Sequence, residues 1–321
     1  MHRKPKVSII IPAYNAQKYI KDTLMSCCNQ TYDNVEIVVI DDGSDDKTLE
    51  VVKSINSDNI IILNQKNQGV TTARENGIQN CNGEFLFFLD SDDILDEKAI
   101  DILLSYYLEN NSDIVIGQSK SFGYGSSRKS KYKEGIYNEP FSQFLMCSLP
   151  FTLWPSLYRR ELFNCLEYDY ELKVGEDYMI ICQIIAKSSS VTVCSDVIHY
   201  YRRHKDSVTA TPSKIKFYDS YRSFKYVIDF SESSALPLKD ELIYHQVQYL
   251  YSQEFSGSPY SRDIKRFLEK KIGKKDIEKS LIDMGVPKYI RIVFKYNLIF
   301  NIMNFIMRQV RRFIQKVRLL K

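Results

Sequence analysis

Four short apolar runs constrain the fold of this chain more than any other feature. They are VSIIIP at 7–12, VEIVVIDD at 35–42, IIILNQ at 60–65 and EFLFFLD at 84–90. Short runs rich in β-branched and aromatic residues predict strands that are buried on both faces. Between them, residues 16–29, 45–56 and 69–80 carry apolar side chains at helical spacing. Strands that alternate with helices predict an α/β fold with a mostly parallel sheet and helices on both faces.

Length, composition and cysteine content indicate the size of the folded domain and the cellular compartment. The 321 residues are 44% hydrophobic and 26% charged, which is enough for one large domain or two smaller ones with a real core. The seven cysteines are odd in number and lack CxxC spacing, so we expect reduced thiols. The first apolar run spans only five residues before Pro12, which is too short for a signal-peptide core. We therefore expect the body of the protein in the cytoplasm.

Polar residues follow three of the predicted strands. In a parallel sheet, ligands bind at the carboxyl ends of the strands. The motifs there are PAYN, DDGSDDKT and DSDD, and their residues should converge on one edge of the sheet: Pro12, Tyr14, Asp41, Asp42, Asp90, Asp92 and Asp93.

The DSDD motif places three carboxylates directly after a strand. Carboxylate oxygens at this spacing suit Mg²⁺ or Mn²⁺, which keep open positions for a substrate. A calcium loop of the EF-hand type is excluded, because Ile94 and Leu95 stand where it needs an oxygen ligand and a glycine. The alternative is that the motif only caps a helix beginning near Ile94.

The Asp41-Asp42 pair has two interpretations. A carboxylate at a strand end can accept a hydrogen bond from the N3–H of uracil or from a ribose hydroxyl, and so select a nucleotide. The alternative is a strand-to-helix turn, in which Gly43 takes an unusual backbone conformation and Ser44 or an aspartate caps the helix.

Several motifs, taken in order, resemble the family-2 glycosyltransferases. They are VSIIIPAYN, VEIVVIDDGSDDKT, NQGVTTARENGI and GEFLFFLDSDD, followed by LWPSLYRRELF, VGEDYMI and YYRRHKDSVT. The resemblance covers about two thirds of the chain and ends near Pro212. It implies the GT-A fold, a Rossmann-like, mostly parallel mixed sheet flanked by helices.

The resemblance also implies how a nucleotide-sugar is bound. Pro12 and Tyr14 would line the base, and Asp42, with Asp41, would hold uracil. Arg74 occupies the Ala-Arg position near the nucleotide.

Further roles concern the metal and the reaction. Asp92 resembles the carboxylate that binds ribose, Asp93 the metal ligand of a DxD-type motif, and Asp90 its supporting first position. Asp177 of the GED motif resembles the catalytic base of inverting members. A bound Mn²⁺ or Mg²⁺ would offset charge on the leaving diphosphate, and one base with no second carboxylate nucleophile indicates inversion.

The implied activity is transfer of a sugar from a nucleotide-diphosphate sugar, with UDP favoured, to a hydroxyl of a glycan or lipid-linked acceptor in cell-surface polysaccharide synthesis. Two alternatives stay open: an inactive nucleotide- or carbohydrate-binding module, and a nucleotidyltransferase that makes nucleotide-sugars. The second would need a Gly-rich phosphate loop after the first strand, where PAYNAQKY has no glycine.

Other residues have open interpretations. Trp154 either stacks on a sugar or anchors the core. His199 or His204 supplies a further metal ligand or lies at the surface. Arg202, Arg203 and Lys205 either cover the diphosphate in a closing loop or form a solvated basic strand end.

The chain is expected to divide at 212/213. Residues 1–105 form the nucleotide-sugar half of the transferase domain and 106–212 the acceptor half. Residues 213–321 form a helical C-terminal region that ends in a basic amphipathic segment.

The basic character of the chain lies in this tail. Past Asp283 there are nine Lys and Arg residues and no acidic residue, and the uncharged stretch 296–307 is too short to span a bilayer. This pattern indicates a helix on an anionic membrane surface, at the inner face of the plasma membrane, or a basic helix packed on the protein. Nucleic acid is not expected as a partner, because apolar residues alternate with the cations.

Overall fold

The computed structural model describes residues 4–125, 127–130, 132–145, 148–204, 219, 222–223, 225–227 and 229–231. The chain divides into two compact units, residues 1–234 and 235–321, and all the described residues lie in the first. Those between 219 and 231 are helical. The boundary predicted at 212/213 and the basic tail segment lie outside the described residues and stay predictions.

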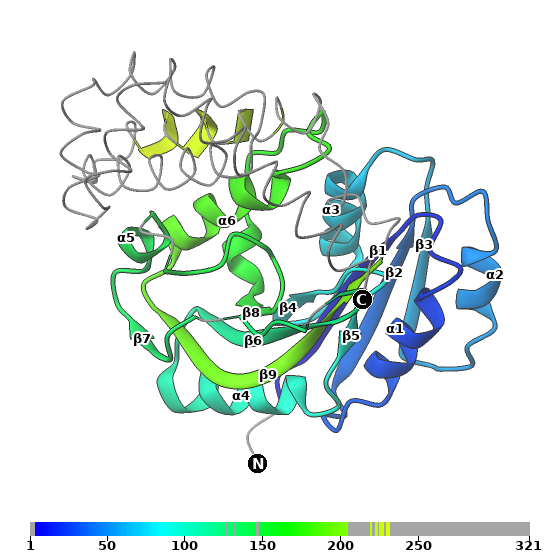
Figure 1. The fold of residues 1–321 in the computed structure, drawn as a ribbon, viewed down its shortest axis with the longest axis horizontal. Coiled ribbons are helices and arrows are strands. Elements are labelled where there is room, and N and C mark those ends of the chain that lie inside the picture. The colour runs from blue at the N-terminus through cyan, green and yellow to red at the C-terminus, as the bar shows by residue number, and fades with distance from the viewer. Residues whose placement is uncertain are drawn as a thin grey trace, which may run out of the picture. The chain divides into compact units, whose positions relative to one another are not determined.

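The described residues form one nine-stranded mixed sheet (Figure 1). Its strand order is β3-β2-β1-β4-β8-β6-β9-β5, and β7 pairs with β9. The longest ladders, β1–β2, β2–β3 and β6–β9, are parallel, whereas β8 is antiparallel to β4 and β6. The predicted mostly parallel α/β sheet is confirmed. The strands are β1 Val7–Ala13, β2 Val35–Asp41, β3 Ile60–Asn64, β4 Phe85–Phe88, β5 Ile94–Leu95, β6 Ile114–Gly123, β7 Gly135–Tyr137, β8 Ser156–Arg159 and β9 Val191–Arg203.

Helices cover both faces of the sheet because strand side chains alternate between the faces. Ile9 and Ile11 of β1 lie in one core cluster with side chains of α1, α2 and α4. Ile10 points the other way and contacts α3 so closely that only Gly77 fits there. The helices are α1 Ile20–Cys28, α2 Thr48–Lys53, α3 Val70–Asn80, α4 Ala99–Asn110, α5 Pro140–Leu145, the 3₁₀ helix η1 Arg160–Phe163 and α6 Glu176–Lys187.

Two expectations need correction. The strand at 60–65 was expected to be buried on both faces, but β3 is an edge strand and its side chains are mostly half-buried. The capping alternative for DSDD placed a helix near Ile94, but Ile94 and Leu95 form β5, which pairs with β9, and α4 begins at Ala99. The carboxylates therefore precede a strand rather than cap a helix.

Among the described residues, no helix is long and apolar enough to cross a membrane. The six described cysteines are free thiols, and four of them are buried.

Candidate active site

The carboxyl ends of β1, β2 and β4 meet at one edge of the sheet. Ala13 pairs with Asp41 in the parallel β1–β2 register, so these two strands end level with each other. Asp90 follows β4, which lies beside β1 on its other side. Pro12 is buried in β1, whereas Tyr14, just past the strand, is 48% exposed. This edge therefore presents an aromatic ring and several carboxylates, as the strand polarity predicts.

Asp41 and Asp42 are both buried but differ in their hydrogen bonds. Asp42 Oδ1 accepts hydrogen bonds from Gln65 Nε2 at 2.8 Å and Gln68 N at 2.9 Å, and its Oδ2 accepts one from Gly69 N at 2.8 Å. It thereby fixes the loop that leads into α3. Asp41 Oδ1 is buried with no hydrogen-bond partner among the described residues. Of the two, Asp41 thus has an acceptor oxygen that can take a hydrogen bond from a ligand.

Arg74 of α3 joins three carboxylates from two places in the sequence. Its Nη1 lies 2.7 Å from Asp177 Oδ1 and 2.9 Å from Glu176 Oε1, and its Nη2 lies 3.2 Å from Asp90 Oδ1. Arg74 is only 5% exposed, so these ion pairs are shielded from water. One guanidinium therefore connects the carboxylate motif after β4 with the first turn of α6.

Asp177 is held from two sides at the start of α6. Besides Arg74, the backbone N–H of Leu153 donates to Asp177 Oδ2 over 3.3 Å. Burial raises the pKa of Asp177 to about 6, and the neighbouring Glu176 adds to the rise while Arg74 opposes it. A carboxylate with a raised pKa accepts a proton more readily than an ordinary one, which suits a general base.

Asp93 points into the protein. Its side chain is fully buried, Oδ2 lies 3.0 Å from His199 Nε2, and Oδ1 accepts a hydrogen bond from Arg202 N at 2.7 Å. The other imidazole nitrogen of His199 lies 3.0 Å from Ser119 Oγ. Burial raises the pKa of Asp93 to about 8 and lowers that of His199 to about 4. Both oxygens of Asp93 are thus engaged within the core, between β9 and the DSDD turn.

Asp92 is half-buried and faces His204. Asp92 Oδ2 lies 2.7 Å from His204 Nε2, and the two side chains are 29% and 16% exposed. His204 Nδ1 is buried without a hydrogen-bond partner among the described residues, and its ring packs on Tyr19 at 4.8 Å between centroids. A carboxylate and an imidazole, both good metal ligands, therefore meet at a partly exposed edge.

Arg202 of β9 contacts the residues around the Asp92–His204 pair. Its guanidinium lies over the rings of Tyr19 and Phe122, at 5.1 and 4.9 Å from their centroids. Its Nε donates to the backbone oxygen of Asp92 at 2.7 Å, and its Nη2 bonds Asp22 at 3.2 Å. The contacts of the guanidinium thus stabilise the DSDD turn. They do not favour the alternative in which Arg202 covers a diphosphate.

Trp154 is half-buried beside the same strand. Its indole stacks on His199 at 4.7 Å and on Tyr201 at 5.5 Å between ring centroids. The preceding residue, Leu153, bonds Asp177. Trp154 therefore connects the buried Asp93–His199 pair with the segment that holds Asp177, and this packing accounts for its position.

The sequence profile of the family named Glycosyl transferase family 2 matches residues 8–167, a span that includes β1 to β4 and the DSDD motif. The chain belongs to glycosyl transferase family 2. The resemblance inferred from its motifs is therefore confirmed.

Curated relatives agree with this family assignment. "Glycosyltransferase GlyA" of Streptococcus pneumoniae serotype 4 is 30% identical over 219 residues, 64% of this chain and 31% of that protein. "Cholesterol galactosyltransferase" of Borreliella burgdorferi is 28% identical over 269 residues, 78% of this chain and 73% of that protein. The chain matches about a third of the length of GlyA and of "Poly(ribitol-phosphate) beta-glucosyltransferase" of Bacillus spizizenii.

Solved structures agree on the fold. The crystal structure of Staphylococcus aureus TarS 1-349 in complex with UDP has a TM-score of 0.69 and 22% sequence identity, and the match covers 94% of this chain and 89% of that one. This family-2 chain therefore has the GT-A architecture that its motifs predict.

Two features of this family-2 site are not predicted from the sequence. The resemblance implies only that Arg74 lies near the nucleotide, and the structure adds its ion pairs with Asp90 and Asp177. The position of the Arg202 guanidinium over the rings of Tyr19 and Phe122 is likewise seen only in the structure. In both cases the partners lie far away in the sequence, so the spacing of residues along the chain does not predict the contacts. The cluster of charges in YYRRH indicates only that the segment containing Arg202 matters.

Proposed function

We propose that this chain is an inverting glycosyltransferase that moves a sugar from a nucleotide-diphosphate sugar, with UDP favoured, to a hydroxyl of a glycan or lipid-linked acceptor. The observation that carries the proposal is the group of ion pairs that Arg74 makes with Asp90, Glu176 and Asp177. It places Asp177, a carboxylate with a raised pKa at the start of α6, beside the DSDD motif. The names of the relatives support it, because TarS has been crystallised with UDP and with UDP-GlcNAc.

Asp41 is our choice for the uracil contact. Its Oδ1 is buried and lacks a partner among the described residues, and a buried acceptor of this kind favours a ligand with an N–H to donate. The resemblance gave this role to Asp42 with Asp41, but both oxygens of Asp42 accept hydrogen bonds from the loop before α3. Pro12 and Tyr14 keep their proposed place beside the base, since Tyr14 is exposed at the same edge.

Asp92 and His204 fit a divalent cation better than Asp93 does. They present an oxygen and a nitrogen toward each other at the exposed edge, whereas Asp93 is buried with both oxygens engaged. No group of three or more His, Cys, Asp or Glu side chains in the described part of the chain could hold a metal, so substrate oxygens would complete the coordination. When bound, Mn²⁺ or Mg²⁺ supplies charge neutralisation for the departing diphosphate. Asp90 supports the motif through Arg74.

Asp177 acts as the base in this proposal. It takes the proton of the acceptor hydroxyl as that oxygen attacks the sugar C1 from the face opposite the diphosphate, which inverts the anomeric centre. Arg74 and the Leu153 N–H orient the carboxylate for that transfer.

The basic tail is our proposed attachment to an anionic membrane surface at the inner face of the plasma membrane. The support is its sequence, in which nine cations past Asp283 alternate with apolar side chains. A transferase that extends a lipid-linked acceptor would find its substrate at such a surface.

Calorimetric titration of UDP into the full chain, with and without Mn²⁺, tests the proposal. We expect binding that depends on the metal. Absence of binding for UDP and for dTDP in both conditions would contradict the transferase and support an inactive module.

A further inference from the structure

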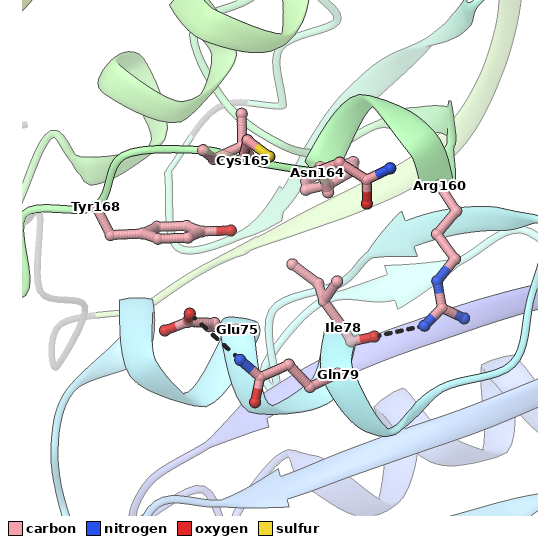
Figure 2. A pocket seen from close by; sticks show the side chains of 9 residues that line it. Glu75, Ile78, Gln79, Arg160, Asn164, Cys165 and Tyr168 are labelled. Carbon is pink, nitrogen blue, oxygen red and sulfur yellow. Dashed lines mark hydrogen bonds between the residues drawn. The ribbon is translucent and has the colours of Figure 1, made fainter.

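A hollow lies beside α3. It has a volume of about 410 Å³, within the range of small-molecule sites, and opens between α3 and the segment that follows β8. Figure 2 shows Glu75 and Gln79 of α3 across the hollow from Tyr168 and Cys165. The lining residues are Glu75, Ile78, Gln79, Arg160, Phe163, Asn164, Cys165, Leu166 and Tyr168.

The two walls of this hollow are fastened together. Arg160 Nη1 donates to Cys81 O at 2.6 Å and its Nη2 to Ile78 O at 3.0 Å, so η1 is tied to the last turn of α3. Phe163 packs on Phe88 of the sheet, with ring centroids 5.3 Å apart. The pocket is therefore pre-formed rather than a gap between loose segments.

Its lining combines an apolar surface with hydrogen-bonding groups. Ile78, Leu166 and the ring of Tyr168 supply the apolar part. Gln79 and Asn164 supply amide groups, which donate and accept. This is the chemistry that suits a pyranose ring, which has one apolar face and a rim of hydroxyls.

The charges of the lining disfavour an anion. Arg160 directs both Nη groups to backbone carbonyls. Glu75 carries the negative charge of the lining, and its Oε2 accepts a hydrogen bond from Tyr170 Oη at 2.9 Å. A carboxylate has about four lone-pair sites, so Glu75 can also accept hydroxyl donors from a ligand. The lining holds one cation and one anion and so has no net charge to attract a phosphate, whereas a neutral polyol needs none.

We propose that this pocket is a second carbohydrate site, which binds one neutral pyranoside unit apart from the reaction centre. Glu75 follows Arg74 in α3, and successive helix positions point about 100° apart, so the two sites lie on different faces of one helix. The proposal does not depend on the activity proposed above. If that activity holds, the pocket would retain a distant unit of a long acceptor and raise its effective concentration at the base.

Saturation-transfer NMR of the full chain tests the site. The probes are the methyl β-glycosides of glucose, galactose and N-acetylglucosamine, each with and without saturating UDP and Mn²⁺. We expect at least one probe to bind in both conditions. Tyr168→Ala and Gln79→Ala should each weaken that probe about tenfold, which corresponds to about 1.4 kcal/mol.

Matched variants separate this site from other causes. Tyr124→Ala removes a tyrosine that is 65% exposed and outside the pocket, and should bind as the wild type does. Asp177→Asn should also keep the probe. Circular dichroism checks that each variant is folded. If Tyr168→Ala unfolds, the Gln79→Ala variant still tests the site, because Gln79 is exposed. Three results would overturn the proposal: no probe binding, displacement by UDP, or unchanged affinity in a folded Gln79→Ala variant.

Discussion

Arg74 shows at the residue scale how one side chain can organise a site. It replaces water around Asp90, Glu176 and Asp177, which would otherwise repel one another in a partly dry environment. Its pKa lies above the usual value despite burial, because three carboxylates surround it. Asp177, the base in our proposal, therefore keeps a fixed orientation before any substrate arrives.

Replacing Asp177 by Asn tests its role as base. The amide keeps the shape and the bond from Leu153 N but cannot take a proton, so transfer should fall about 10²–10⁴-fold. Calorimetry should find UDP affinity unchanged. A large loss of UDP affinity would move Asp177 to the nucleotide site.

The raised pKa of Asp177 predicts a pH dependence. Because the base must be deprotonated and its pKa is about 6, kcat/KM should be half-maximal near pH 6 and level off at higher pH. Glu176→Gln removes a negative neighbour that raises this pKa, so the midpoint should move to lower pH. A profile that stays flat between pH 5 and 7 would contradict the assignment.

Asp92 and Asp93 should respond differently to the same substitution. Asp92→Asn should abolish the Mn²⁺ dependence of UDP binding without lowering the melting temperature, because Asp92 is partly exposed. Asp93→Asn should lower the melting temperature, because it disturbs a buried contact with His199. Paired calorimetry and thermal melts decide between them; the reverse pattern would restore Asp93 as the metal ligand.

At the scale of elements, α3 and β9 position the side chains of the candidate site. β9 runs for 13 residues beside β6 and brings His199 and Arg202 to the DSDD turn. α3 lies so close to the sheet that a Cβ on Gly77 would come within 2.7 Å of Ile10 Cγ2. The position of Arg74 thus depends on a glycine one turn away.

Gly77→Ala should push α3 away from β1. Overpacking costs about 1–3 kcal/mol, and a gain of up to about 1 kcal/mol in helix propensity offsets part of it. We expect a lower melting temperature and, because Arg74 moves with the helix, slower transfer. Thr72→Ala on the outer side of α3 is the control and should change stability by about 0.5 kcal/mol or less. Equal effects of the two variants would show that close packing at Gly77 is unimportant.

At the scale of the whole molecule, the charge is uneven. The net charge is +4, but the nine cations past Asp283 leave −5 for the preceding residues. A polybasic segment gains about 1 kcal/mol per cation near an anionic leaflet. The full chain should therefore float with vesicles that contain phosphatidylglycerol and not with pure phosphatidylcholine.

A charge-neutralised chain is the matched variant for this flotation test. Changing Arg308, Arg311, Arg312 and Lys316 to Gln should weaken vesicle binding by about a hundredfold or more, and added salt should weaken the wild type. Equal binding to neutral vesicles, or no effect of the four changes, would leave the tail as a helix packed on protein.

The sequence by itself determined the α/β class, the parallel core strands and the edge at which the carboxylates gather. These follow from local patterns, since apolar runs set the strands and the connecting helices set their common direction. The order of the motifs also identified the family.

Only the tertiary structure decided which carboxylate does what. Asp92 and Asp93 are neighbours in sequence, yet one faces His204 at the surface and the other His199 in the core. Asp41 and Asp42 differ in the same way. Adjacent strand or turn residues point to opposite sides, and their partners come from about 25 to 110 positions away, so spacing along the chain cannot tell them apart.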